Sequence, residues 1–339
     1  MPVPTLTLAP MQDVSVLPLW RCLERRGGPD VYVTEYFRVH RDSAPEKKVL
    51  RSINECPGGK PIIAQMIGNE PEHLLRTARL IQDATDCAGI DVNLGCPAPK
   101  VCGKQAGGAL LKNHDLIRRI AMELRPVVSG KLTLKTRVGF ETPDEFDDLL
   151  ELFASLPIDG LAIHGRTVRE RYQSPVHTDC IARAVEVLPF PVTANGSIIS
   201  VETGLAVLEK TKAAGLMIGR GGIRDPWLFE AIRAALRGER KPQTTLRDVC
   251  EYILELSDEI SREGEFDNDT QLVHRMKKFT NYIASGIHEG ALSHSLRRCT
   301  TLTDFQEICR EHLETDGLFP IEPPDDGKLF CGFRELVTG

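Results

Sequence analysis

Short hydrophobic runs recur along the first two thirds of the chain, and stretches with the spacing of amphipathic helices lie between most of them. The stretches 71–84 and 114–124, for example, show the 3.6-residue period of a helix with one apolar face. The runs between such stretches are β-rich, and most end in glycine or a polar residue. This pattern predicts eight strands, which begin at or near Thr5, Val31, Pro61, Gly89, Lys131, Gly160, Phe190 and Gly215.

Eight strands that alternate with helices predict an α/β protein with a parallel sheet, and eight is the number that closes a (β/α)8 TIM barrel. An open, doubly wound sheet is the alternative. That fold usually carries a GxGxxG turn after its first strand, whereas this chain continues there as LAPMQDV. We therefore predict a closed barrel over residues 1–239.

The pattern changes after the barrel, where four predicted helices follow one another with short polar breaks. They cover residues 245–261, 270–285, 290–299 and 302–313. Apolar residues of the second helix form a stripe suited to packing in a bundle, namely Leu272, Met276, Phe279 and Ile283. We predict a small all-α helical-bundle domain over residues 240–315. Residues 316–339, rich in proline, glycine and aspartate, are predicted to form a C-terminal tail.

We expect a cytoplasmic protein with a large core. The core is expected because 41% of the 339 residues are hydrophobic. No apolar run approaches the roughly 20 residues of a membrane span, so we expect no membrane contact. The first residues, MPVPTLTLAP, lack the basic and apolar regions of a signal peptide. The ten cysteines should then stay reduced, and the absence of a CxxC pair indicates neither a zinc site nor a disulfide framework. We expect no metal.

The formal net charge of −6 argues against nonspecific binding of nucleic acid. Residues 1–239 carry 30 lysines and arginines against 29 acidic residues, whereas residues 240–339 carry 12 against 19. A polyanionic partner would therefore have to bind local basic patches. Nothing in the sequence indicates a protein partner, and we expect a monomer.

Polar side chains lie at the ends of at least six predicted strands, where barrel enzymes carry their chemistry. They are Gln65, Asn93, Cys96, Lys135, Arg137, His164, Arg166, Asn195 and Arg220. Each of them alone has a structural explanation, because such side chains commonly pair with backbone groups inside a protein. Their recurrence on so many strands favours one shared pocket.

The loops after the seventh and eighth strands are rich in glycine. ANGSI (194–198) and GRGG (219–222) allow backbone N–H groups to approach a phosphate, and Arg220 adds positive charge. The phosphate could belong to a substrate or to a cofactor. Lys135 favours a cofactor, because a cation inside a barrel needs an anionic partner and a reduced flavin carries negative charge at its N1–O2 edge.

Several longer motifs occur in barrel order: APM (9–11), TE (34–35), QMIG (65–68), DVNLGCP (91–97), GGALL (107–111), LKTRVG (134–139), IHGRT (163–167), ANGSI and IGRG (218–221). Through these motifs the chain resembles the tRNA-dihydrouridine synthases, which are flavin enzymes with an FMN-binding barrel and a helical C-terminal domain. The combination of NxGCP with IHGRT is highly specific to that family.

The resemblance implies reduction of a uridine in the tRNA D-loop to 5,6-dihydrouridine, with NADPH or NADH as the reductant of FMN. It also implies a set of residues that bind the cofactor. FMN would contact Pro10, Met11, Gln12 and Gln65 at its ring, Lys135 at its N1–O2 edge, His164 beside the ring, and Asn195, Gly196, Ser197, Gly219 and Arg220 at its phosphate.

From the sequence alone Cys96 could be a metal ligand, half of a disulfide, a small buried apolar residue or a reactive thiol. The resemblance implies that Cys96 donates a proton to uracil C5 while reduced FMN delivers hydride to C6, and that Asn93 contacts the base. A thiol suits this role, because its pKa starts near 8.5 and nearby cations lower it. The family does not require a cysteine at Cys102, which we interpret as incidental.

A narrower resemblance concerns the bacterial subfamily that modifies position 16 of tRNA. The expected tRNA contacts are Arg38, Arg166, Tyr172, Arg275, Lys277 and Arg297. Two features depart from this subfamily, the sequence RGGIRDPW after the last strand and the acidic charge of residues 240–339.

Three other functions are compatible with parts of this pattern. An FMN-barrel dehydrogenase that acts on a free pyrimidine or another small molecule would lack the helical domain. A noncatalytic RNA- or FMN-binding protein would not need Cys96, Lys135 and His164 together. A phosphate-binding isomerase barrel without flavin would explain only the glycine-rich loops.

Overall fold

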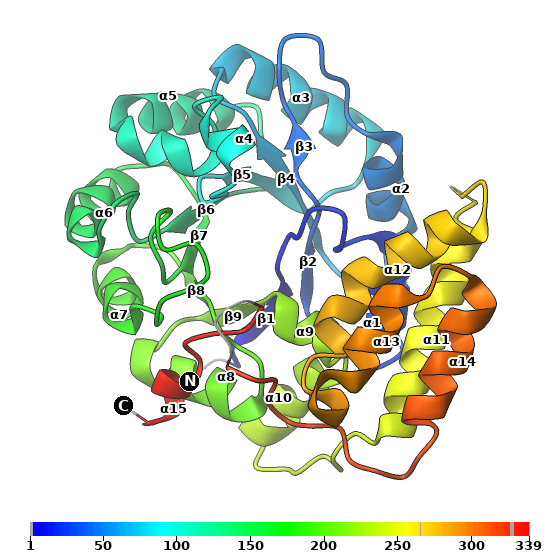
Figure 1. The fold of residues 1–339 in the computed structure, drawn as a ribbon. Helices are drawn as coiled ribbons and strands as arrows, with labels where there is room; N and C mark the ends of the chain where they lie inside the picture. The colour runs from blue at the N-terminus through cyan, green and yellow to red at the C-terminus, as the bar shows by residue number, and fades with distance from the viewer. Residues whose placement is uncertain (1–2, 265, 326–328, 339) are drawn as a thin grey trace.

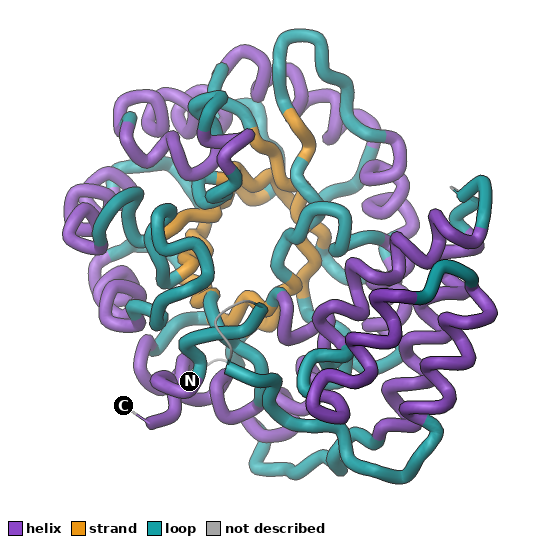
Figure 2. Tube along the Cα trace, in the orientation of Figure 1, coloured by secondary structure: helices purple, strands orange, loops and turns teal. Residues whose placement is uncertain are grey.

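The computed structural model describes residues 3–264, 266–325 and 329–338. Eight parallel strands form a closed barrel, because β1 pairs with both β2 and β9 while β2 also pairs with β4. Figure 2 shows the strands as a ring inside a circle of helices. The barrel strands are β1 (Thr5–Leu8), β2 (Val31–Val33), β4 (Ile62–Ile67), β5 (Gly89–Asn93), β6 (Lys131–Arg137), β7 (Gly160–His164), β8 (Val192–Asn195) and β9 (Gly215–Ile218).

All eight predicted strands are confirmed, and so is the closed barrel. The strands could be predicted from hydrophobic runs because most of their residues are buried in the fold. Every residue of β4, β5, β7 and β9 is inaccessible to solvent or nearly so. Such continuous burial is typical of parallel strands that have the barrel interior on one side and helices on the other. One short strand, β3 (Phe37–Arg38), was not predicted; it extends the sheet beside β4.

The helices that follow the strands form the outer ring of the barrel (Figure 1). Their amphipathic faces pack against the strands, as in α3, where Pro71 begins the helix and Leu74, Ala78 and Ile81 are buried. The ring and its short accessory helices comprise α1 (Leu17–Glu24), α2 (Lys47–Glu55), α3 (Pro71–Ala84), α4 (Pro99–Cys102), α5 (His114–Leu124), α6 (Phe146–Ala154), α7 (Thr178–Val187), α8 (Val201–Thr211), α9 (Arg220–Arg224) and α10 (Leu228–Leu236).

The four helices predicted after the barrel are also confirmed, and they form a bundle at one side of it (Figure 1). Three of them begin at a side chain that caps the first turn: Thr245, Asn268 and Thr301 each accept a hydrogen bond from a backbone N–H three residues later. The helices are α11 (Leu246–Arg262), α12 (Asp269–Ile283), α13 (Ala291–Arg298) and α14 (Leu302–Leu313).

Three acidic residues in and just after α11 pair with arginines of the barrel. Glu259, which is 3% exposed, pairs with Arg21 of α1 at 3.1 Å, and Glu263 pairs with Arg51 of α2 at 2.8 Å. Glu255 pairs with Arg26 at 2.6 Å. Part of the negative charge of residues 240–339 is therefore neutralised at the contact with the barrel and is not presented to a ligand.

The C-terminal segment does not extend away from the protein. Leu318 forms an antiparallel bridge with Thr245, and the side chains of Phe319, Phe330 and Phe333 are buried. The chain ends in α15 (Arg334–Thr338), which packs against α8 of the barrel. Among the described residues, no helix is both long and apolar enough to span a membrane.

Candidate active site

A cavity of about 400 Å³ opens at the carboxyl ends of the barrel strands. Its walls come from the loops after six of the eight strands, together with Tyr282 of α12 and Leu329 of the C-terminal segment. This position and size are typical of the active site of a TIM barrel. The residues predicted from sequence that line it are Pro10, Met11, Gln12, Asn93, Cys96, Lys135, His164, Tyr172, Asn195, Gly196, Ser197, Gly219 and Arg220.

The charged side chains that line the cavity are all cations, namely Lys135, Arg137 and Arg220; none of the described residues in its wall is an aspartate or a glutamate. Burial disfavours their charged forms and lowers the pKa of each, that of Lys135 to about 8. The neighbouring cation Arg137 lowers the pKa of Lys135 further. An anionic ligand would offset this cost, so the cavity is suited to a negatively charged molecule.

His164 is held in its neutral form. Burial lowers the pKa of its imidazole well below 6.5, and the nearby cations Arg137 and Lys135 lower it further. Its Nδ1 atom is buried and has no hydrogen-bond partner among the described residues, and the same is true of Gln12 Oε1. Unpaired buried polar atoms are costly, so both atoms indicate a ligand with polar groups of its own.

Asn195, at the end of β8, orients the lysine of β6, which lies two strands away in the barrel. Its Oδ1 accepts a hydrogen bond from Lys135 Nζ at 3.2 Å, while its Nδ2 donates to the carbonyl of Met217 at 2.7 Å. Both ends of the amide are thus used, and the side chain cannot rotate without losing a bond. The ammonium group of Lys135 is thereby held toward the cavity.

A chain of buried hydrogen bonds supports the loop that carries Cys96. Asn93 Oδ1 accepts from the backbone N–H groups of Gly95 (3.1 Å) and Cys96 (2.9 Å), and its Nδ2 donates to Gln65 Oε1 at 2.8 Å. Gln65 in turn donates to Asp91 at 2.8 Å. Burial raises the pKa of Asp91 to about 7. This network makes Asn93 a positioning residue for Cys96.

The position of Gln65 differs from the sequence-based expectation that it lines the flavin ring. Its side chain is fully buried and lies beneath the wall of the cavity, where it joins Asp91 to Asn93. A strand residue that points into a barrel can lie in a lower layer of side chains, and its position in the sequence does not reveal which layer.

The Cys96 thiol lies in the cavity wall on a tightly packed loop. The carbonyl of Cys96 accepts from the N–H of Gly108 at 3.1 Å and from the thiol of Cys102 at 3.4 Å. Gly107 has a φ of +59°, and a Cβ atom there would come within 3.1 Å of Cys96 Cβ, which explains the glycine pair of the GGALL motif. Cys102 lies outside the cavity wall, and burial raises the pKa of its thiol.

The turn after β8 has the conformation expected for a loop that approaches a ligand. Gly196 has a φ of +130° and Ser197 a φ of +52°, a value uncommon for a residue with a side chain. Such backbone strain is typical of binding sites. At Gly219 after β9, a Cβ atom would lie 3.3 Å from the sulfur of Met11, so a side chain there would crowd the cavity.

The residues predicted to contact tRNA lie in different environments. Arg38 is exposed and stacks on the ring of Tyr36 at 5.8 Å, and Arg297 is exposed at the end of α13. Tyr172 is 42% exposed and borders the cavity, with its ring 5.9 Å from that of His164. Lys277 instead donates to two carbonyls at the end of α13, those of Arg297 (3.0 Å) and Cys299 (2.7 Å).

Arg166, which we expected to contact tRNA, does not lie at the surface, because its side chain is fully buried. Its Nη2 atom donates to Ser197 Oγ at 2.8 Å and to the carbonyl of Cys331 at 2.9 Å. Its Nη1 atom is buried without a hydrogen-bond partner among the described residues. An arginine two residues after the end of a barrel strand is commonly exposed in a loop. Here the C-terminal segment covers Arg166.

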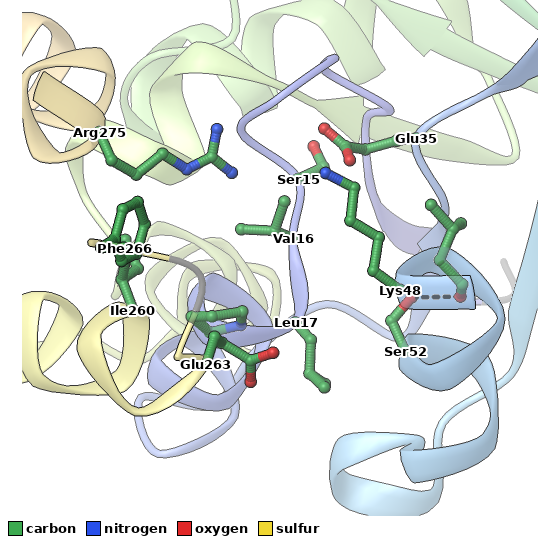
Figure 3. Close-up of a pocket in the computed structure, with 12 residues that line it drawn as sticks. Ser15, Val16, Leu17, Glu35, Lys48, Ser52, Ile260, Glu263, Phe266 and Arg275 are labelled. Atoms are coloured by element: carbon green, nitrogen blue, oxygen red, sulfur yellow. Dashed lines mark hydrogen bonds between the residues drawn. The ribbon is translucent and has the colours of Figure 1, made fainter. Parts of the chain in front are cut away.

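Arg275 borders a second, smaller cavity of about 50 Å³ between the barrel and the bundle (Figure 3). Figure 3 shows its guanidinium group on one side and Lys48 with Glu35 on the other. Glu35 is 3% exposed, one of its carboxylate oxygens has no hydrogen-bond partner among the described residues, and burial raises its pKa. A third cavity, of about 800 Å³, lies beside α10 and contains none of the predicted site residues.

Tyr36, Arg137, Tyr282 and Leu329 are among the residues that border the active-site cavity but were not assigned to a site from the sequence. Arg137 was recognised as a strand-end cation. It joins the loop after β5 to the loop after β7 through hydrogen bonds to the carbonyls of Gly95 (2.8 Å), Thr167 (2.8 Å) and Arg171 (2.7 Å). Tyr36 follows the TE motif directly, so the motif could have indicated it. No sequence signal places Tyr282 or Leu329 at the cavity.

The family profile described as "Dihydrouridine synthase (Dus)" matches residues 7–316 of this chain. The chain belongs to the dihydrouridine synthase family. It is 30% identical to a probable tRNA-dihydrouridine synthase of Helicobacter pylori, over 92% of this chain and 93% of the relative. It is 32% identical to tRNA-dihydrouridine synthase B of Pseudomonas putida, over 92% and 94%, and 33% identical to tRNA-dihydrouridine(16) synthase of Cupriavidus necator, over 74% and 81%. As a member of the dihydrouridine synthase family, the chain is an oxidoreductase.

Solved structures support the fold. A histamine dehydrogenase from Rhizobium sp. 4-9 matches with a TM-score of 0.55 at 12% identity, over 92% of this chain and 62% of that one. A 2-naphthoyl-CoA reductase matches with a TM-score of 0.53 at 10% identity, over 95% and 69%. At such low identity these similarities show the barrel fold alone.

Proposed function

We propose that this dihydrouridine synthase reduces a uridine in the D-loop of tRNA to 5,6-dihydrouridine, with FMN as its bound cofactor and NADPH or NADH as the reductant. In this proposal residues 1–239 form the catalytic barrel and residues 240–315 the tRNA-binding domain. The observation that carries the proposal is the cavity itself, in which three cations, the unpaired His164 Nδ1 atom and Cys96 lie together.

The cavity has the features that an FMN molecule requires. Lys135 would hold the negatively charged N1–O2 edge of the reduced ring, and His164 and Gln12 would pair their free buried atoms with its polar edge. The phosphate would lie at the loops that contain Asn195, Gly196, Ser197, Gly219 and Arg220. When bound, the flavin supplies the hydride that uracil C6 receives.

Cys96 would act as the general acid for the same reaction, since reduction of the C5–C6 bond also requires a proton at C5. The thiol lies in the wall of the cavity with the flavin-binding residues, and the Asn93 amide holds the backbone on its N-terminal side. Asn93 borders the cavity as well and would contact the uracil base. A base that lies within folded tRNA has to leave its stack to enter such a cavity.

The tRNA would lie across the mouth of the barrel and the adjoining face of the bundle. Arg38, Tyr172 and Arg297 are exposed and are the strongest candidates for contacts, whereas Lys277 would act mainly by supporting the end of α13. Glu255, Glu259 and Glu263 do not oppose this arrangement, because arginines of the barrel neutralise them.

The proposal is tested by incubating the purified protein and NADPH with unmodified tRNA. We expect a yellow protein with FMN bound, and dihydrouridine detected by mass spectrometry at one uridine of the D-loop, position 16 being the first candidate. A protein that cannot be loaded with FMN would contradict the proposal. Turnover of free uracil or uridine in preference to tRNA would support a small-molecule dehydrogenase instead.

The exposed arginines give a second prediction. Replacing Arg38 and Arg297 together by glutamine should weaken tRNA binding and flatten its dependence on salt. Each phosphate contact contributes roughly 0.7–0.9 to the slope of log affinity against log salt, so the slope should fall by about one to two units. The measurement is tRNA affinity at several salt concentrations.

Arg119 and Arg183, which are exposed on barrel helices outside the cavity mouth, provide the matched control as a double glutamine variant. NADPH oxidation without tRNA should be the same in all three proteins. An unchanged slope in the Arg38/Arg297 variant would remove these residues from the tRNA surface.

A further inference from the structure

The C-terminal segment returns from the bundle to the carboxyl face of the barrel. Figure 1 shows it in red, passing from the end of α14 toward α15, which lies beside α8. The first part is fixed by the backbone of Phe319, which donates to Thr244 at 2.8 Å, and by Arg224, which donates to the carbonyl of Pro320 at 2.7 Å. Its later part, Leu329 to Phe333, contacts residues of the cavity.

Two carbonyl groups of this later part accept hydrogen bonds from residues that follow β7, β8 and β9. The carbonyl of Cys331 accepts from Ser197 Oγ at 3.1 Å and from Arg166 Nη2 at 2.9 Å. The carbonyl of Leu329 accepts from Arg220 Nη1. Leu329 also forms part of the cavity wall, so the segment is a component of the site.

Side-chain packing holds these carbonyls in place. The ring of Phe330 lies 5.7 Å from the guanidinium group of Arg220 and makes an edge contact with Tyr282 at 6.3 Å. Phe330 and Phe333, which are 2% and 0% exposed, form a small apolar cluster with Ile199 of the loop after β8. The segment is therefore anchored to both the bundle and the barrel.

We infer that residues 329–333 close the phosphate end of the cofactor cavity and make it selective for FMN over FAD. This inference rests on the proposed function. In FMN the phosphate is a terminal monoester, whereas in FAD it continues through a second phosphate into an adenosine. Beyond Ser197 and Arg220 a second phosphate would meet the carbonyl oxygens of Leu329 and Cys331, which repel its oxygens. It would also have to break the bonds that these carbonyls receive from Arg166, Ser197 and Arg220.

Gly332 offers a way to displace the segment without changing a residue of the cavity wall. Its φ is +64°, and a Cβ atom there would lie 2.7 Å from the carbonyl oxygen of Ser174 and 3.0 Å from Pro175 Cα. Both are backbone atoms, so Gly332→Ala must move the segment or the loop beneath it. Gly264→Ala is the matched control, because Gly264 has a φ of +68° and, apart from its chain neighbours, no atom of the described residues lies within 4 Å of the added Cβ.

The experiment measures the dissociation constants of FMN and FAD by flavin fluorescence for the full-length wild-type protein and both variants. We expect the wild type and Gly264→Ala to bind FMN much more tightly than FAD. In Gly332→Ala the ratio of the two constants should fall by about tenfold or more, since a hydrogen bond to a charged group has an effect of that size.

An unchanged ratio in Gly332→Ala would overturn the inference, and so would a wild type that binds both flavins equally. A wild type that binds neither flavin would instead contradict the proposed function. If Gly332→Ala does not fold, Phe330→Ala replaces it, because this change removes the contacts to Arg220 and Tyr282 and leaves the backbone free of strain. The same fall in the ratio is expected there, and an unchanged ratio again overturns the inference.

Discussion

Cys96→Ala should form dihydrouridine about 10²–10⁴-fold more slowly than the wild type, which is the usual cost of losing a general acid. The variant should still bind FMN and oxidise NADPH, because the thiol makes no hydrogen bond to the predicted flavin-binding residues in the described structure. The alanine also keeps the backbone N–H that donates to Asn93, so the loop should retain its conformation. Rates of product formation and of NADPH oxidation, measured on the same preparation, separate the two effects.

Cys102→Ala is the control for this experiment. Its thiol donates to the carbonyl of Cys96 and lies outside the cavity wall, so its loss should change the rate by less than a factor of about three, as expected for one weak hydrogen bond. Equal losses in the two variants would show that the loop as a whole matters rather than the Cys96 thiol. A slow Cys102 variant together with a normal Cys96 variant would show that Cys102, and not Cys96, is the general acid.

Lys135→Met should slow the reduction of bound FMN by NADPH about 10²–10³-fold, the typical effect of removing one preorganised charged donor. The ammonium group is held beside the cavity by Asn195, and methionine has a similar length but no charge. Lys131→Met is the matched control, because Lys131 belongs to the same strand but is exposed at its opposite end. Stopped-flow absorbance at the flavin band measures the rate.

The pKa of Lys135 gives this prediction a pH dependence. Without a ligand, burial lowers the pKa from 10.5 to about 8, so the cation is present below pH 8 and lost above it. An anionic flavin binds better to the charged form, and its affinity should therefore decrease as the pH rises above about 8, by up to about tenfold per unit. Lys135→Met should abolish this decrease. A wild-type affinity that does not change between pH 7 and 9.5 would contradict the assignment.

The same shift affects stability with a definite sign. Between pH 8 and 10.5 the unfolded chain keeps the Lys135 proton while the empty folded protein has lost it. The contribution of Lys135 to the free energy of unfolding of the ligand-free protein should therefore increase as the pH rises through that range, so that the protein becomes more stable.

The sequence by itself determined the barrel, its eight strands and the four helices of the bundle. Parallel strands that are buried on both faces, such as β4 and β5, are mostly apolar, and the polar residues at their carboxyl ends are conspicuous where the loops begin. Cys96, Lys135, His164 and Asn195 could be grouped in one pocket for this reason. The order of the strands, and the fact that their carboxyl ends lie on one face of the barrel, follow from the local pattern and the chain connectivity.

Only the tertiary structure decided which residues lie beneath this pocket and which segments cover it. Gln65 lies in a lower layer because its side chain pairs with Asp91 and Asn93, and Arg166 is buried because Cys331, far along the chain, covers it. The acidic residues of α11 face arginines of α1 and α2 that are more than 200 positions away in sequence. Such contacts join segments whose local patterns are ordinary, and their energy comes from pairing that exists only once the bundle and the C-terminal segment have packed on the barrel.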